Sequence, residues 1–260
     1  MSRYRAAWKY RKLLAGLAAD QRVAVAFSGG VDSSLLLAAA LAARGDGVLV
    51  FHARTPLQAA GEYERAMAVA AGLRCRPEVV TVDPYSWPDF VANPPERCYF
   101  CKKRLYSLFQ EKACASDCSV LLDGTNWDDL RQDRPGLRAL QELQVRTPLA
   151  DAGLTKIEIR RLAREQGLAN WDKPSASCLA TRIMAQQPIT PAKIALVGQG
   201  ESLLQELGFT GARFRHYGAR CLIEVARRDA GLLGQDSVLA QLESRCRRLG
   251  FARMELGWRP

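Results

Sequence analysis

Residues Val23–Leu37 read VAVAFSGGVDSSLLL, and this stretch decides the fold. An apolar run suited to a buried strand enters a glycine turn at Ser28–Ser34, and an alanine- and leucine-rich segment continues to Arg44. This order predicts a strand, a tight turn and a helix. The glycines of the turn permit backbone angles that let successive N–H groups point inward as a nest for an anion. The positive end of the helix, which opens near Asp32, lies at the same point, so a phosphate-binding loop is predicted here.

The turn differs from two common phosphate loops. The Walker A pattern needs a Gly-Lys pair, which occurs nowhere in the chain, and the Rossmann fingerprint Gly-x-Gly-x-x-Gly is also missing from the turn. SGGVDSS resembles instead the PP-loop of the ATP pyrophosphatases, enzymes that cleave ATP between the α- and β-phosphates and leave AMP on an oxygen of the substrate. The alternative is a purely structural glycine turn, which requires neither flanking serines nor an acid.

The PP-loop resemblance implies which residues bind the cofactors, expected to be ATP and Mg²⁺. The residues expected to hold the pyrophosphate are Ser28, Gly29, Gly30, Val31, Asp32, Ser33 and Ser34. Asp32 is expected near the magnesium ion that bridges the pyrophosphate, which makes it a catalytic candidate.

The bulk composition predicts a soluble, cytoplasmic protein. At 260 residues the chain suggests one large domain with room for a small second one. Its apolar runs stay below the roughly 18 residues of a membrane span, and its basic N-terminus lacks the apolar segment of a signal peptide. The net charge of +10 suits a polyanion such as RNA or a nucleotide, or else reflects a preference for Arg at solvated positions. No basic stripe interleaved with aromatic residues is visible, so a nucleic-acid partner is not expected.

The order of elements predicts an α/β protein with a parallel, doubly wound sheet of the adenine nucleotide α-hydrolase type. Further elements are expected as strands at 48–52, 78–82 and 119–123 and as helices at 62–72 and 102–115, and Thr155–Glu158 is a capping box that starts another helix. Ligands of such sheets sit beyond the carboxyl ends of the strands. Phe51 and His52 therefore fall beside the phosphate loop, where they are expected to line the adenine site; His52 is alternatively a catalytic base or a packed residue.

Beyond Pro188 the composition changes, and a small α+β domain is expected. Its predicted elements are helices at 190–207 and 236–249 and strands at 212–216, 219–226 and 252–257. With the boundary placed near Gln187, residues 1–187 form an ATP pyrophosphatase domain and residues 188–260 a domain for substrate binding and assembly.

Eight cysteines in a chain without a signal peptide argue for metal or sulfur chemistry rather than for disulfides. Cys98 and Cys101 form a CxxC motif, expected on a loop before a helix, with basic neighbours that favour the thiolate. Alone, the motif fits a redox pair, half of a zinc site or half of an iron–sulfur site. Cys178 is the third candidate, because it lies in a loop flanked by Lys173 and Arg182.

Longer motifs resemble the LarE family of ATP-dependent sacrificial sulfur transferases over nearly the whole chain. They are RCYFCKKRLY from Arg97, DGTNWDDLRQDRPG from Asp123, GLTKIEIRRLA from Gly153, WDKPSASCLATRI from Trp171 and RFRHYGARCLIEV from Arg213. The family adenylates a carboxylate of pyridinium-3,5-biscarboxylic acid mononucleotide, and sulfur then displaces AMP to leave a thiocarboxylate, in the synthesis of a nickel-pincer cofactor. The first step is needed because a carboxylate is a poor electrophile and an acyl phosphate is a good one.

The resemblance implies two routes for the sulfur. In some members the cysteine that aligns with Cys178 gives up its own sulfur and is left as dehydroalanine. Other members carry three cysteines, matching Cys98, Cys101 and Cys178, and bind a 4Fe–4S cluster whose open iron holds an extra sulfide. Because this chain has all three, the cluster is the expected cofactor. The resemblance leaves the role of Tyr99 open.

The resemblance also implies a substrate site in the C-terminal part. Arg213 and Arg215 alternate to one face of a predicted strand and are expected to bind the substrate phosphate. Glu201 and Glu224 match family acids near the pyridinium ring and are expected to balance its positive charge. The expected partner is thus a small mononucleotide, with no membrane involved, and the family's assemblies predict a homo-trimer or homo-hexamer.

The segment after the fourth predicted strand resembles another wall of the family's nucleotide site. Its residues are Asp123, Thr125, Asn126 and Asp129. Acids at this place are expected to bind magnesium, and the alternative is that they cap the following turn.

Two other functions remain as alternatives. A tRNA-thiolating enzyme shares the PP-loop, can use a three-cysteine 4Fe–4S site and needs a positive surface, but ordinarily adds an RNA-binding region with paired CxxC knuckles, and this chain has one CxxC. A nucleotide sensor without catalysis would keep the PP-loop for binding only, yet it needs neither Asp32 nor cysteines in loops.

Overall fold

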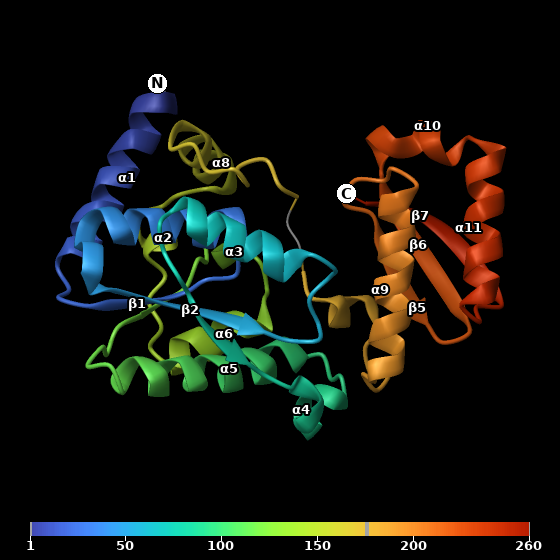
Figure 1. Cartoon of the computed structure of the whole chain (residues 1–260), viewed down its shortest axis with the longest axis horizontal. Coiled ribbons are helices and arrows are strands. Elements are labelled where there is room, and N and C mark those ends of the chain that lie inside the picture. Colours follow the sequence, from blue (N-terminus) through green and yellow to red (C-terminus); the bar gives the residue numbers. More distant parts are fainter. Residues whose placement is uncertain (1, 175–176, 260) are drawn as a thin grey trace. The chain divides into compact units, whose positions relative to one another are not determined.

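The computed structural model describes residues 2–174 and 177–259 (Figure 1). The chain divides into two compact units. The first comprises Met1–Thr55, Gly61–Asp83 and Glu96–Lys173, and the second comprises Pro56–Ala60, Pro84–Pro95 and Pro174–Pro260. This division departs from the predicted boundary near Gln187, since residues before it already belong to the second unit: Ile183 forms a parallel bridge with His216. A functional division into residues 1–187 and 188–260 stays a prediction.

Four parallel strands form the sheet of the first unit, in the order β3-β2-β1-β4. They are β1 Val23–Ala26, β2 Val48–Arg54, β3 Glu78–Thr81 and β4 Leu121–Leu122. Val23 pairs with Val48 on one side of β1, and Ala24 pairs with Leu121 on the other. All of β1 is buried, which is why its sequence is continuously apolar.

Helices cover both faces of this sheet (Figure 1). On one side lie α1 Ser2–Ala18, α2 Val31–Arg44, α3 Glu62–Gly72 and α8 Lys156–Glu165; on the other lie α5 Arg97–Cys114 and α6 Pro135–Glu142. Leu17, Leu36, Ala70 and Ile159, one from each helix of the first group, share a core with β1. The parallel, doubly wound α/β fold expected from the sequence is confirmed.

The strand order creates a switch point between β1 and β4. The chain runs from β1 to β2 and β3 on one side, and returns to place β4 on the other side of β1. In such sheets, ligands bind at the carboxyl ends of the strands where the direction of winding reverses. The two segments that leave this point are the glycine turn after β1 and the segment that starts at Asp123 after β4.

Short elements complete the first unit and its connections. They are the 3-10 helices η1 Gly45–Gly47, η2 Pro84–Ser86 and η3 Asp129–Arg131, and the single-turn helices α4 Pro88–Val91 and α7 Pro148–Asp151. α5 begins at Arg97, earlier than the predicted residue 102, so Cys98 and Cys101 lie within the first turns of a helix and not on a loop. Glu96 is the N-cap residue of that helix.

The second unit contains a three-stranded sheet in the order β5-β6-β7, antiparallel and then parallel. Its elements are η4 Leu179–Arg182, α9 Pro191–Glu206, β5 Arg213–Tyr217, β6 Arg220–Ala226, η5 Arg227–Asp229, α10 Ala230–Leu233, α11 Asp236–Arg248 and β7 Arg253–Arg259. Phe214, Ile223, Leu204 and Leu242 are buried together, so α9 and α11 pack on the same face of this sheet. The expected small C-terminal α+β unit is confirmed, with one continuous helix at α9.

In the described part of the chain, every helix is too short or too polar to cross a membrane.

Candidate active site

Two close backbone approaches shape the loop between β1 and α2. Gly29 has a φ of 78°, and a Cβ at this position would lie 2.5 Å from Cβ of Ala66 on α3. A Cβ on Gly124, in the segment after β4, would lie 2.9 Å from the backbone nitrogen of Ser33. Both positions therefore require glycine. The second approach brings the segment after β4 against the first turn of α2.

The three serines of the loop differ in what they offer to a ligand. Ser28 is exposed, and its hydroxyl oxygen accepts a hydrogen bond from the backbone N–H of Gly30 at 3.3 Å. Ser33 and Ser34 are buried, and their hydroxyls donate to the carbonyl oxygen of Gly30 at 3.0 and 2.9 Å. Val31 is buried in the core. The inner serines thus hold the turn, while the Ser28 hydroxyl is accessible.

Asn170 supports the loop from the opposite side and was missed by the sequence analysis. Its Nδ2 donates to the carbonyl oxygen of Gly29 at 3.0 Å and to Oγ of Ser34 at 2.9 Å. The side chain is buried, so these bonds are shielded from water. The only sequence signal was its position next to the motif that begins at Trp171.

Asp32 lies in the first turn of α2 and forms an ion pair with Lys156, the first residue of α8. Burial raises the pKa of the Asp32 carboxyl; Lys156 opposes this rise, and the carboxylate of Asp129 adds to it. Oδ1 of Asp32 is buried and accepts no hydrogen bond from the residues that the structure describes. Mg²⁺ is commonly held by one or two carboxylates together with phosphate oxygens, so this oxygen fits such an ion.

Asp123 follows β4 and is surrounded by donors. Its Oδ2 accepts from the hydroxyl of Tyr106 and lies 3.2 Å from Nζ of Lys102, and its Oδ1 accepts from the backbone N–H of Thr125 at 2.7 Å. Burial alone would raise the pKa of Asp123, but Lys102, Thr125 and Tyr106 outweigh it, and the pKa lies below its usual value. Asp123 and Thr125 thus anchor Lys102, and their contact with the nucleotide or Mg²⁺ stays a prediction.

Asn126 makes the contacts of a turn cap. Its side-chain oxygen accepts from the backbone N–H groups of Asp128 and Asp129 at 2.9 and 3.1 Å, and its own N–H donates to Oδ2 of Asp129 at 3.1 Å. These bonds precede η3 and favour the capping alternative for Asn126. A nucleotide contact by Asn126 stays a prediction.

Phe51 and His52, at the carboxyl half of β2, are both about 1% exposed. The ring of Phe51 stacks on Phe109 with centroids 5.6 Å apart, and Nδ1 of His52 lies 2.9 Å from the carbonyl oxygen of Phe27. Burial lowers the pKa of His52, although the Phe27 carbonyl and Glu62 oppose the shift. Both side chains pack as core residues, which favours the packed alternative for His52, and their role toward adenine stays a prediction.

The CxxC motif occupies the N-terminal turns of α5. Cys98 is exposed and Cys101 half-buried, and Nη2 of Arg97 lies 3.6 Å from Sγ of Cys98. Of the two lysines expected to favour the thiolates, Lys102 pairs with Asp123 and Lys103 with Glu142. Arg97 and the helix N-terminus are therefore the described groups that favour a Cys98 thiolate.

Tyr99 joins this turn to α6. Its hydroxyl donates to Oε2 of Glu142 at 2.7 Å and accepts from Nζ of Lys103 at 2.9 Å, while the guanidinium carbon of Arg138 lies 3.9 Å from the ring centroid. Tyr99 is therefore an anchor for the cysteine-bearing turn.

Cys178 is exposed in the second unit, next to η4. Among residues 2–174 and 177–259, no group of three or more His, Cys, Asp or Glu side chains is placed to hold a metal ion. The CxxC motif supplies two thiols and Cys178 a third. Three thiols are the donor set that a 4Fe–4S cluster with one open iron requires, so the residues present fit that group chemically.

Charged side chains gather in the second unit around β5. Nε of Arg215 lies 2.8 Å from Oε2 of Glu224, and Nε of Arg182 donates to Oε1 of Glu201 at 2.5 Å. Burial lowers the pKa of Arg213, and the positive charges of Arg259, Arg182 and Arg215 lower it further. Arginines held this close together despite their repulsion form a site for a polyanion such as a phosphate.

The sequence analysis identified two of these four arginines and missed Arg182 and Arg259. Arg182 could have been found, since it follows Cys178 by four residues in a loop already recognised as electropositive. Arg259 offered no such signal. Glu201 and Glu224 lie here as expected, but each carboxylate is paired with an arginine of the chain.

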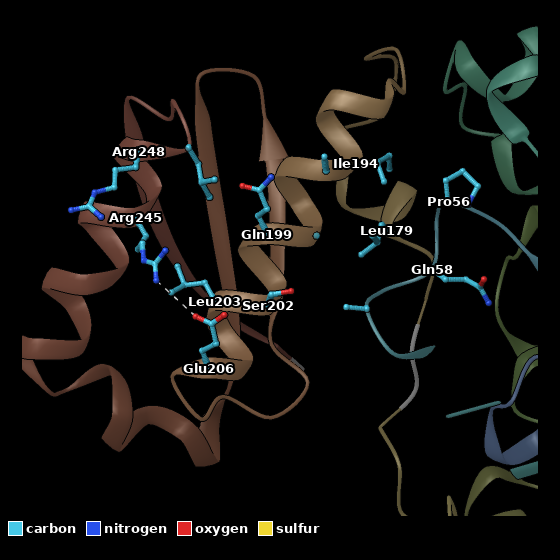
Figure 2. Close-up of a pocket in the computed structure, with 14 residues that line it drawn as sticks. Pro56, Gln58, Leu179, Ile194, Gln199, Ser202, Leu203, Glu206, Arg245 and Arg248 are labelled. Atoms are coloured by element: carbon cyan, nitrogen blue, oxygen red, sulfur yellow. Dashed lines mark ion pairs between the residues drawn. The ribbon is translucent and has the colours of Figure 1, made fainter. Parts of the chain in front are cut away.

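A separate cavity of about 760 Å³ lies within the second unit, along α9 (Figure 2). Gln199, Ser202 and Glu206 line it from α9, with Arg245 and Arg248 from the last turns of α11. Arg245 approaches Glu206 at 3.9 Å. None of the predicted site residues lines this cavity.

The glycine- and serine-rich nest at the switch point defines the first unit as a nucleotide-binding domain of the PP-loop class. In agreement, the family model described as asparagine synthase matches residues 14–100. A glutamine-hydrolysing GMP synthase of Methanoculleus marisnigri is similar in one of its component chains, with 26% identity over 204 residues, 73% of this chain and 65% of its own.

Two relatives are similar over most of the chain. The pyridinium-3,5-bisthiocarboxylic acid mononucleotide synthase of Lactiplantibacillus plantarum is 36% identical over 248 residues, 94% of this chain and 88% of its own. An uncharacterized protein of Synechocystis sp. is 35% identical over 230 residues, 88% of this chain and 86% of its own. The chain belongs to the family of this synthase, the LarE family, and is an ATP-dependent sulfurtransferase of the PP-loop superfamily.

Proposed function

We propose that the protein converts a carboxylate of pyridinium-3,5-biscarboxylic acid mononucleotide into a thiocarboxylate, with ATP consumed, as a step in nickel-pincer cofactor synthesis. The observation that carries the proposal is the alignment of 94% of the chain with a relative that is named as the synthase of the bisthiocarboxylic acid mononucleotide. Support also comes from the two kinds of anion site, a phosphate nest in the first unit and an arginine cluster in the second.

The first chemical step is adenylation. A carboxylate oxygen of the substrate attacks the α-phosphorus of ATP, the α–β anhydride bond breaks, and pyrophosphate leaves with the electron pair. The backbone N–H groups of the loop and the Ser28 hydroxyl hold the pyrophosphate, and Asp32 holds Mg²⁺. When bound, Mg²⁺ supplies positive charge that stabilises the leaving group.

The arginine cluster binds the phosphate of the mononucleotide. Arg213 and Arg215 lie on the same face of β5, since residues two apart in a strand point the same way. Glu224, opposite Arg213 in the register of β5 and β6, lies on that face as well. Glu201 and Glu224 orient Arg182 and Arg215, and their negative charge also suits the pyridinium ring of the substrate.

The sulfur is delivered by way of a 4Fe–4S cluster on Cys98, Cys101 and Cys178. The cluster supplies an open iron at which a sulfide can be carried. Cys98 and Cys178 are exposed, which a shared ligand set requires. The second candidate is that Cys178 gives up its own sulfur, which the exposure of its thiol also favours. We further propose a homo-trimer or homo-hexamer, on the family resemblance alone.

The test is iron and acid-labile sulfide content, with a visible spectrum, of protein purified without oxygen. We expect about four irons per chain in the wild type and loss of iron in Cys98→Ala, Cys101→Ala and Cys178→Ala. Cys114→Ala is the matched control, because Cys114 is exposed at the end of the same helix but outside the motif. No iron after reconstitution would overturn the cluster, and loss of the Cys178 sulfur after turnover would then identify that residue as the donor.

A second experiment tests the substrate. Protein, ATP, Mg²⁺ and the biscarboxylic acid mononucleotide are incubated together, and mass spectrometry is used to detect replacement of oxygen by sulfur. Loss of this product in Arg213→Met with ATP affinity unchanged is expected, since Arg213 lies outside the nucleotide-binding unit. Labelled sulfur found in tRNA instead of the mononucleotide would favour a tRNA-thiolating enzyme.

A further inference from the structure

In the first unit, one lysine occupies the carboxylate that the proposed function assigns to Mg²⁺. Nζ of Lys156 is hydrogen-bonded to Oδ2 of Asp32, although the two residues are 124 positions apart. Asp32 lies in the first turn of α2, where the nest for the pyrophosphate begins. Lys156 was not among the residues expected in the site, so its presence there needs an explanation.

The backbone of Lys156 is fixed independently of this contact. Its N–H donates to Oδ2 of Asp128 at 2.8 Å. Thr155 is the N-cap of α8 and forms a capping box with Glu158, which in turn pairs with Lys9 at 2.6 Å. Because these bonds hold the helix start, the side chain of Lys156 can change partner without a change in the fold. That side chain is 26% exposed and has room to move.

The surroundings of Asp32 require a cation at all times. The carboxylate is largely buried, the negative charge of Asp129 acts on it, and its Oδ1 has no donor among the described residues. An uncompensated charge in such a place is costly. One ammonium satisfies Oδ2 in the nucleotide-free protein. A divalent cation arriving with ATP would compete for the same carboxylate, since two cations repel each other at this range.

We propose that Lys156 is an exchangeable counter-ion: its ammonium neutralises Asp32 while the site holds no nucleotide, gives way to Mg²⁺, and then binds a phosphate oxygen of the nucleotide. A lysine is suited to this exchange because its charge sits at the end of a flexible stem with three donors. The inference rests on the proposed function only in that a nucleotide and a divalent cation bind at this loop. It does not depend on the sulfur donor or on the second substrate.

The test uses Mn²⁺ as a paramagnetic probe, counted as the free ion by electron paramagnetic resonance, with Mg²⁺ as competitor. In Lys156→Met without nucleotide, Mn²⁺ should bind about three- to tenfold more tightly than in the wild type, because its competitor is removed. In the same variant, ATP measured by calorimetry with Mn²⁺ present should bind about tenfold more weakly, because a charge-assisted bond to phosphate is lost. These opposite signs distinguish exchange from a structural role, which would weaken both.

Two controls make the outcome decisive. Lys9→Met removes another partly buried ion pair of α8, the one with Glu158, and should leave Mn²⁺ and ATP affinities unchanged. Lys156→Arg keeps the charge and should retain most of the wild-type weakness toward Mn²⁺. Unchanged or weaker Mn²⁺ binding in both Lys156→Met and Lys156→Gln would overturn the proposal. If no variant binds ATP and the wild type does not either, the proposed function fails instead.

Discussion

Nζ of Lys102 lies 3.2 Å from Oδ2 of Asp123, and this contact joins the helix that carries the CxxC motif to the segment that follows β4. Lys102 is the residue after Cys101, and Gly124, the residue after Asp123, packs against Ser33 of the phosphate loop. The cysteine-bearing turn and the nucleotide nest are therefore connected through one buried carboxylate. A change at Asp123 should affect the stability of the first unit and the position of both sites.

Asp123→Asn should lower the free energy of unfolding by about 2–4 kcal/mol at neutral pH, because it removes a buried anion from three donors. The pKa of Asp123 is lowered in the folded protein, so its contribution is present above the unfolded pKa of about 3.9 and is lost as the pH falls through the folded value. The acid decline of stability should therefore be shallower in Asp123→Asn. Denaturant unfolding between neutral and acidic pH measures both effects.

Asp20→Asn is the control for that experiment. Asp20 pairs with Arg146 at 2.5 Å, but the pair is partly exposed, so its removal should cost no more than about 1 kcal/mol. Equal losses for the two variants would contradict the assignment of Asp123 as a buried anchor.

Gly29→Ala should distort the phosphate loop. The added Cβ would lie 2.5 Å from Cβ of Ala66, and the backbone of Gly29 is left-handed. We expect a loss of about 2 kcal/mol or more and a strong loss of ATP affinity, measured by denaturant unfolding and calorimetry. Gly16→Ala is the matched control: it lies in α1, the described chain leaves its Cβ position open, and the change should add about 0.5–1 kcal/mol. An unaffected ATP affinity in Gly29→Ala would show that the loop does not hold the nucleotide.

The sequence predicted those parts of the structure that depend on short-range patterns. The strand, turn and helix from Val23 to Arg44 follow from apolar runs interrupted by glycines, and the capping box of Thr155 and Glu158 follows from two residues three apart. The start of α5 at Arg97 was misjudged, because nearby prolines suggested a loop that would continue through Cys98. A helix needs no strong local signal when tertiary contacts hold its first turn, as the bonds of Tyr99 to α6 do here.

Side-chain pairs distant in sequence could not be predicted in the same way. The bond from Lys156 to Asp32 spans 124 residues and that from Asn170 to Gly29 spans 141. Such pairs exist because the parallel sheet and its helices bring separate segments to the carboxyl edge of β1. No periodicity or local motif in one chain reports which of many lysines and asparagines will arrive there.

The reactivity of the eight thiols should follow their burial. In cluster-free protein, iodoacetamide should modify the exposed Cys98, Cys114 and Cys178 first. Cys118 and Cys221 are buried, and burial raises the pKa of the Cys118 thiol, so both should react only on unfolding. Mass spectrometry of tryptic peptides at successive times gives the order.

The same labelling separates the two sulfur routes. In protein reconstituted with iron and sulfide, Cys98 and Cys178 should become protected while Cys114 keeps its rate, since cluster ligands are not available as nucleophiles. Equal labelling of all three exposed thiols before and after reconstitution would argue for Cys178 as a sacrificial donor.

Arg182 and Glu201 form a buried ion pair, with side chains only 6% and 11% exposed. Arg182→Met leaves the carboxylate of Glu201 without its partner, and should cost about 3–5 kcal/mol in the free energy of unfolding. The double variant with Glu201→Gln should recover part of this loss, because no unpaired charge remains. Arg220→Met is the control: Arg220 pairs with Glu255 at 3.0 Å at the surface, and its loss should cost less than about 1 kcal/mol.

Arg182 also bonds the loop that carries Cys178, since its Nη1 donates to the hydroxyls of Ser177 at 2.8 Å and Thr181 at 2.6 Å. The double variant should therefore regain stability without regaining sulfur transfer, because methionine cannot hold the loop. Single-turnover assays under conditions where the double variant is fully folded measure this difference. Full activity in that variant would mean that Arg182 serves the fold alone, and that Ser177 and Cys178 are positioned by other contacts.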